Sequence, residues 1–170
     1  MPTATYEYIS SGNLTSGSVN SVTFGSGGTL TQAYTDLVLV VNGGASNPAD
    51  IHVRFNGDSG ANYTFQSMAK ISGNGISGSR YSSGTEMSFT TNAYFRSGFQ
   101  NASHTTITSY SNPYINKTAL SRSTFGATEI DLVLGTWKNV NAVTSMSVTL
   151  SNSATWTSSS TMYLYGIKEA

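Results

Sequence analysis

The side chains best suited to acid–base or nucleophilic chemistry are few in this sequence and lie far apart. The two histidines, His52 and His104, each lie in a strand-like run among polar neighbours, and neither has the spacing of a helical metal-ligand pair. Serine is abundant, but no serine lies between glycines in the pattern of a nucleophile elbow. Since a catalytic site needs several convergent titratable groups, the sequence predicts a protein without enzymatic activity, cofactor or bound metal.

Two groups of oxygen-bearing side chains are candidates for acid–base work or cation binding. Glu129 and Asp131 are two residues apart and would project from one face of a strand. Without a second converging pair, we expect them to begin a strand at its solvated end. Asp58, with Asn56 and Asn62, offers the oxygen ligands that Ca²⁺ prefers, but the spacing matches no complete calcium loop. We expect a structural turn in which these side chains bond the local backbone.

The remaining candidates would bind a partner. Arg54, a cation on a predicted strand, either pairs with a carboxylate across the sheet or presents its guanidinium to a partner subunit. An aromatic and amide cluster near residues 94–104 would stack on a sugar or on another subunit, or else pack in the core. The candidate partner or glycan contacts are therefore Arg54, Tyr94, Phe95, Phe99, Asn101 and His104.

The composition is dominated by neutral polar residues. Of the 170 residues only eight are basic and eight are acidic, whereas ten Tyr, seven Phe and two Trp accompany many Val, Ile and Thr. The latter types favour strands, and a disordered chain would lack them. A net charge of zero argues against a nucleic-acid partner. We expect neither a membrane-spanning segment nor a secretory signal, and the absence of cysteine excludes disulfides.

The spacing of strand-like runs predicts one antiparallel β-sandwich domain over residues 1–170. The runs recur about every dozen residues between Gly, Ser and Asn clusters, as in a sandwich or barrel. No segment has the apolar periodicity of a helix. The expected strands are residues 6–9, 19–24, 36–41, 51–55, 63–71, 87–91, 105–110, 117–124, 129–134, 145–150 and 162–167.

Most of these runs alternate apolar and hydroxylic residues, which indicates one solvated face. In residues 37–41 and 130–134 the Leu, Ile and Val residues are denser, and we expect central strands buried on both faces. Asn56-Gly57 is the strongest turn signal, since both residues tolerate positive φ. The expected loops are residues 25–28, 43–48, 72–84 and 151–160, of which 72–84 is the longest.

Several segments, in order along nearly the whole chain, resemble a family of small β-sandwich virion proteins of tailed, often aquatic, bacteriophages. The match is poorest over residues 94–116. The segments that carry the resemblance are TYEYI (5–9), YTDLVL (34–39), VRFNGDSGANY (53–63), KTALSRS (117–123), Trp137 and LYGIK (164–168).

The resemblance implies a jelly-roll type of sandwich on the virion surface, made in the host cytoplasm and acting without catalysis. We expect a capsid decoration or cement protein that contacts other capsid or tail proteins and forms a homo-oligomer, such as a trimer around a closed axis. The alternative is a tail or fibre module that recognises host surface glycans. A third possibility is a carbohydrate-binding module of a bacterial enzyme. None of these expectations includes nucleic acid or membrane insertion.

Overall fold

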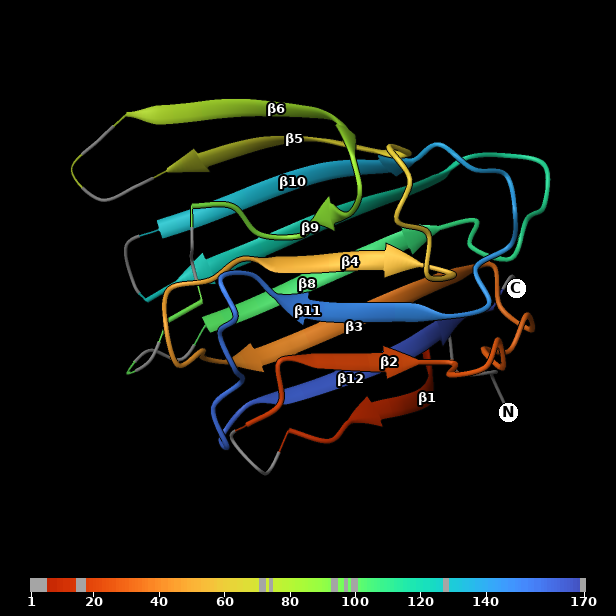
Figure 1. Cartoon of the computed structure of the whole chain (residues 1–170), viewed down its shortest axis with the longest axis horizontal. Helices are drawn as coiled ribbons and strands as arrows, with labels where there is room; N and C mark the ends of the chain where they lie inside the picture. Colours follow the sequence, from red (N-terminus) through yellow and green to blue (C-terminus); the bar gives the residue numbers. More distant parts are fainter. Residues whose placement is uncertain are drawn as a thin grey trace.

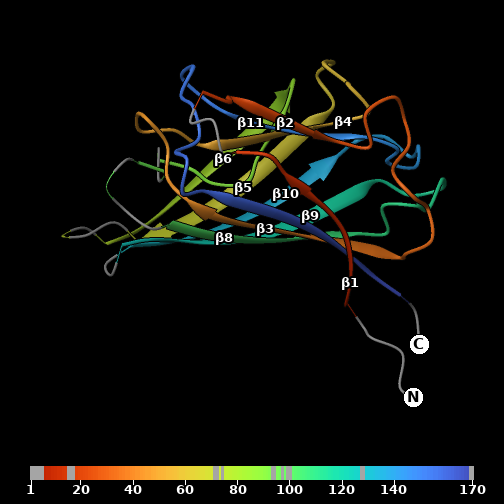
Figure 2. The ribbon, with the colours of Figure 1, turned by 90° about the horizontal axis from the view of Figure 1, so that it is seen from below.

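The structure, a computed structural model, describes residues 6–14, 18–70, 73, 75–92, 95–96, 98, 101–126 and 129–168. These residues form twelve β-strands and no α-helix, and the strands divide into two antiparallel sheets that face each other as layers (Figures 1 and 2). Among them, no helix has the length and hydrophobicity needed to cross a membrane. The predicted all-β sandwich is confirmed, while the jelly-roll type stays a prediction.

The two sheets differ in size, and this difference creates an overhang. Because the larger sheet is wider, β6 and part of β5 extend past the edge of the smaller sheet (Figure 1). The larger sheet has the order β1 (Tyr6–Gly12), β12 (Thr161–Ile167), β3 (Asp36–Gly43), β8 (Asn101–Thr108), β9 (Lys117–Phe125), β10 (Glu129–Trp137), β5 (Tyr63–Lys70) and β6 (Ile76–Gly84). The smaller sheet has the order β2 (Ser21–Phe24), β11 (Met146–Leu150), β4 (Ile51–Phe55) and β7 (Met87–Ser88).

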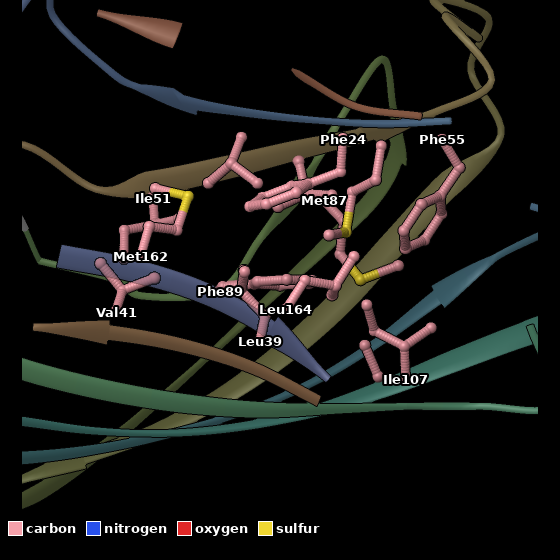
Figure 3. Close-up of a cluster of buried hydrophobic side chains, with 14 of the residues drawn as sticks. Phe24, Leu39, Val41, Ile51, Phe55, Met87, Phe89, Ile107, Met162 and Leu164 are labelled. Carbon is pink, nitrogen blue, oxygen red and sulfur yellow. The ribbon is translucent and has the colours of Figure 1, made fainter. Parts of the chain in front are cut away.

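The hydrophobic core lies between the two layers. Phe24 and Phe55 project into it from the smaller sheet, and Leu39, Ile107 and Leu164 from the larger one (Figure 3). Fully burying a side chain of this size contributes about 1.5–3 kcal/mol. The inner faces of both sheets therefore supply most of the stabilisation, as alternation in the sequence predicts.

The two dense apolar runs have different environments, and one prediction about them is wrong. In β3, Leu37, Val38 and Leu39 are all buried, which agrees with burial on both faces. In β10, Ile130 and Leu134 are each 56% exposed. Along β10 the exposed residues alternate with buried ones, and in the part of the chain that the structure describes the smaller sheet covers only the inner face of the larger sheet (Figure 2).

The loop predicted over residues 72–84 is also wrong, because most of it is the edge strand β6. All residues from Ile76 to Ser83 are exposed, so the strand has no buried face to produce an alternating pattern. Its backbone pairs with β5 from Lys70 to Tyr63, with an irregularity near Phe65. Conversely, the strand expected over residues 87–91 is longer than the observed one, because β7 covers only Met87–Ser88.

Candidate functional site

The aromatic and amide cluster predicted near residues 94–104 does not form an exposed surface in the part that the structure describes. Phe95 is fully buried, with its ring edge-on to Trp156 at a centroid distance of 5.8 Å. Asn101 is buried as well, and its amide donates to a backbone carbonyl of β3. Phe95 and Asn101 are thus wrong as contact residues, because core packing encloses both. Tyr94 and Phe99 lie outside the described residues.

Of the predicted contacts from this stretch that the structure describes, His104 faces outward, on the larger sheet. Its Nδ1 accepts a hydrogen bond from the Arg122 guanidinium at 3.1 Å. Burial, followed by the charge of Arg122, lowers the pKa of His104. These interactions favour a neutral imidazole that positions Arg122 beside the exposed residues of β10.

Those exposed residues form an apolar patch on the outer face of the larger sheet. Leu132 pairs with Met68 of β5, and Leu134 pairs with Leu120 of β9, so the side chains lie side by side on one face. A shallow hollow of about 410 Å³ lies over β3, β8, β9 and β10, and a second of about 390 Å³ over β10, β5 and the start of β6. Both include Ile130 and Leu132. The members of the apolar patch, with their exposed fractions, are Met68 (52%), Leu120 (47%), Ile130 (56%), Leu132 (39%) and Leu134 (56%).

The charges around the apolar patch have one sign. Arg122 pairs with Leu132, and Lys70 pairs with Ile130. On the outward positions of β8, β9, β10 and β5, which the structure describes in full, no acidic residue occurs. The surface is therefore aliphatic at its centre and cationic at its margin.

Arg54 belongs to a different site, a polar cluster beside the overhang. Its guanidinium lies 3.1 Å from Oε2 of Glu86, and its Nε donates to the carbonyl of Thr85 at 3.1 Å. The other carboxylate oxygen, Oε1, lies 2.6 Å from Nδ1 of His52. Of the two interpretations of Arg54, pairing with a carboxylate across the sheet is therefore present, and the cluster also contains His52, which was not predicted to lie there.

Two aromatic side chains, Phe65 and Tyr81, line the same pocket as His52 and Glu86 of this cluster. The rings of Phe65 and Tyr81 stack at a centroid distance of 5.4 Å and an interplanar angle of 25°, and Tyr81 is 52% exposed. A Cβ at Gly84 would lie 2.6 Å from the Tyr81 ring, so glycine is needed there for the ring to take this place. Tyr81 and Glu86 were missed from the sequence. The signal that could have identified Tyr81 is its position as an aromatic residue inside a Gly- and Ser-rich run, which is unusual for a loop.

The turn after β4 has the structural role predicted for it. Asn56 and Gly57 both have positive φ, at 53° and 67°. Asp58 accepts hydrogen bonds from Nε1 of Trp137 at 2.7 Å and from the Asn62 amide at 2.9 Å. Burial alone would raise the pKa of Asp58, but these bonds and one from the Gly60 amide lower it. The carboxylate thus organises the turn through protein donors.

Asp131 contradicts the prediction that it lies at a solvated strand end. It is 1% exposed and accepts hydrogen bonds from the backbone amide of Thr91 at 2.6 Å and from the Thr91 hydroxyl. Burial raises its pKa to about 6. The cause is its inward position in β10, since alternation places Asp131 between the layers and Ile130 outside.

Comparison with family models, with curated proteins and with solved structures finds no match. Within the described residues, no group of three or more His, Cys, Asp or Glu side chains is arranged to hold a metal ion. Function is therefore inferred from two surfaces: the apolar patch, which can exclude water against a partner, and the polar and aromatic cluster at the overhang.

Proposed function

We propose that the protein is a non-enzymatic structural component of the exterior of a tailed-phage virion, most simply a capsid decoration or cement protein. It is made in the host cytoplasm and attaches to other virion proteins through the apolar patch. The sequence resemblance, the β-sandwich fold and the neutral, hydroxyl-rich composition support this proposal. The observation that carries it is the row of half-exposed aliphatic residues on the uncovered face of the larger sheet.

The size of the apolar patch indicates what kind of attachment it supports. Burying the exposed part of one such side chain gains roughly 1 kcal/mol, so the five together gain on the order of 5 kcal/mol. Association itself costs about 4–15 kcal/mol in lost freedom. One patch alone therefore binds weakly, and stable attachment requires additional polar contacts or several linked copies.

The margin of the apolar patch favours a partner of opposite charge. If two copies packed patch to patch around a two-fold axis, the cations Arg122 and Lys70 of one copy would lie near those of the other and repel them. A heterologous contact avoids this repulsion, since the patch of one copy meets a different surface on the next, as in a cyclic trimer. The same argument applies to an acidic, partly apolar surface on a capsid protein.

Cryo-electron microscopy of the virion, combined with binding of the purified chain to particles that lack it, tests the proposal. We expect copies at regular positions on the capsid lattice. Leu132→Lys should reduce their occupancy about tenfold or more, because it places a charge in the centre of the contact. Thr23→Lys, on the exposed outer side of the smaller sheet, is the matched control. Absence of copies from the particle, or equal binding by both variants, contradicts the proposal.

A tail or fibre receptor-binding role is the second candidate. The polar and aromatic cluster at the overhang favours it, because such clusters bind small ligands rather than flat protein surfaces. Copies found only on the tail or at fibre tips would support this role over capsid decoration.

A further inference from the structure

We infer that the cleft at the overhanging edge of the sandwich binds a neutral saccharide. The cleft has a volume of about 270 Å³ and lies where β5 and β6 extend past β7. Small-molecule pockets usually measure about 300–1,000 Å³, so this one suits a single ring-sized unit with the rest of the ligand in solvent. The inference goes beyond attachment to a particle and does not depend on it. The cleft is lined by His52, Phe65, Tyr81, Thr85, Glu86 and Ser88.

The polar wall of the cleft carries matched charges. Glu86 holds Arg54 with one carboxylate oxygen and His52 with the other. The carboxylate of Glu86 and the guanidinium of Arg54 carry opposite charges, so this pair attracts neither anions nor cations strongly. The hydroxyl of Thr85 can both donate and accept, and the carboxylate oxygens of Glu86 keep acceptor sites beyond those that face His52 and Arg54. The wall thus presents both donors and acceptors to a ligand rich in hydroxyl groups.

The aromatic residues of the cleft supply an apolar platform beside these polar groups. Tyr81 is packed against Phe65 on one side and remains half-exposed, so its ring is held in place without being covered. A pyranose has hydroxyl groups around its rim and C–H groups on its faces, and it needs contacts of both kinds. Aromatic rings provide large apolar contact at low entropic cost, because few rotatable bonds are immobilised.

Other ligand classes fit the cleft less well. An anionic ligand would meet the carboxylate of Glu86, both oxygens of which already have partners. A metal ion would find one carboxylate and one imidazole that are bonded to each other, and the described residues offer no third ligand of these types. A neutral saccharide needs no charge rearrangement.

Saturation-transfer NMR of the full chain tests the inference, with the methyl glycosides of glucose, galactose, mannose and N-acetylglucosamine as probes and a glycan array for longer saccharides. We expect at least one probe to bind, and Tyr81→Ala to weaken its binding about tenfold or more. Tyr163→Ala, which removes a 36% exposed tyrosine from β12, is the matched control and should bind as the parent does.

Two further variants keep the test decisive if Tyr81→Ala fails to fold. Gly84→Ala should weaken binding by displacing the Tyr81 ring without removing a ligand contact. Glu86→Gln should weaken it by releasing His52 and Arg54. The inference is overturned if no probe or array glycan binds, or if Gly84→Ala and Glu86→Gln both bind as the Tyr163→Ala control does. Tighter binding of methyl glucuronide than of the glucoside would overturn the assignment of a neutral ligand. Because these measurements use the isolated chain, their outcome is separate from attachment to a particle.

Discussion

Asp131 should make the protein less stable at neutral pH than in mild acid. Its carboxyl group lies between the two sheets, 1% exposed, with Thr91 as its hydrogen-bonding partner. Burial raises its pKa to about 6 from an ordinary value of 3.8; the Thr91 hydrogen bonds oppose this shift, and the negative charge of Asp50 adds to it. The perturbation we consider is Asp131→Asn, which keeps the shape of the side chain and removes its charge.

The magnitude follows from linkage between protonation and folding. The folded pKa lies above the unfolded one, so the folded state binds more protons between about pH 4 and pH 6. The contribution of Asp131 to stability is therefore greatest below about pH 4 and falls as the pH rises through 6. One pKa unit corresponds to about 1.4 kcal/mol, so the ionised group costs the folded state on the order of 3 kcal/mol at pH 7.

Denaturant unfolding of the parent and of Asp131→Asn at several pH values between 4 and 8 measures this effect. We expect the variant to gain relative to the parent as the pH rises, by up to about 3 kcal/mol, a figure that already includes the Thr91 hydrogen bonds because they contribute to the pKa of Asp131. Asp58→Asn is the contrasting control. The pKa of Asp58 is lowered, so its carboxylate stabilises the fold at neutral pH, and this contribution is lost as the pH falls through the lowered pKa. A stability difference between Asp131→Asn and the parent that is the same at pH 4 and pH 8 would refute the reasoning.

Three other substitutions test how the layers pack, each by its free energy of unfolding. Gly135→Ala should destabilise by about 1–3 kcal/mol, because the new methyl group would collide with the Met87 side chain; an unchanged midpoint would mean that Met87 moves aside freely. Leu164→Ala, at a fully buried position, should cost about 2–5 kcal/mol through the cavity it leaves, and a cost near zero would place this residue outside the core. Trp137→Phe should cost about 1.5–3 kcal/mol at neutral pH by removing the donor to Asp58, and the cost should shrink in acid; a cost that does not vary with pH would contradict a charge-assisted bond.

The sequence predicts strands well where one face is buried, because alternation is a local property. β4 is the clearest case: the predicted residues 51–55 are the observed Ile51–Phe55, with Ile51, Val53 and Phe55 buried. β6 fails because an edge strand exposed on both faces has no apolar pattern, and its pairing with β5 is a backbone property. Composition alone favours a loop there.

The candidate sites were predicted only in part, for a related reason. Pairing with a carboxylate was one of two interpretations left open for Arg54, and its partner Glu86 could not be identified without knowing which edge lies beside β4. Phe95 was a candidate contact with core packing as the alternative, and its burial against Trp156 depends on its pairing with Ala49, far away in the sequence. The apolar patch was anticipated as a dense run in β10 but was assigned to the interior.

By itself, the sequence determined the all-β class, the antiparallel pairing and the residues that alternate into the core, since each follows from a pattern that repeats along one strand. Only the tertiary structure decided which faces are covered. The two sheets pack through their inner faces, so the outward aliphatic side chains of β10 stay exposed, and the smaller sheet is narrower than the larger one, so β6 overhangs a cleft. Which residues are covered depends on how many strands each sheet contains and on which faces pack together. Both are set by contacts between segments far apart in the chain rather than by any local run.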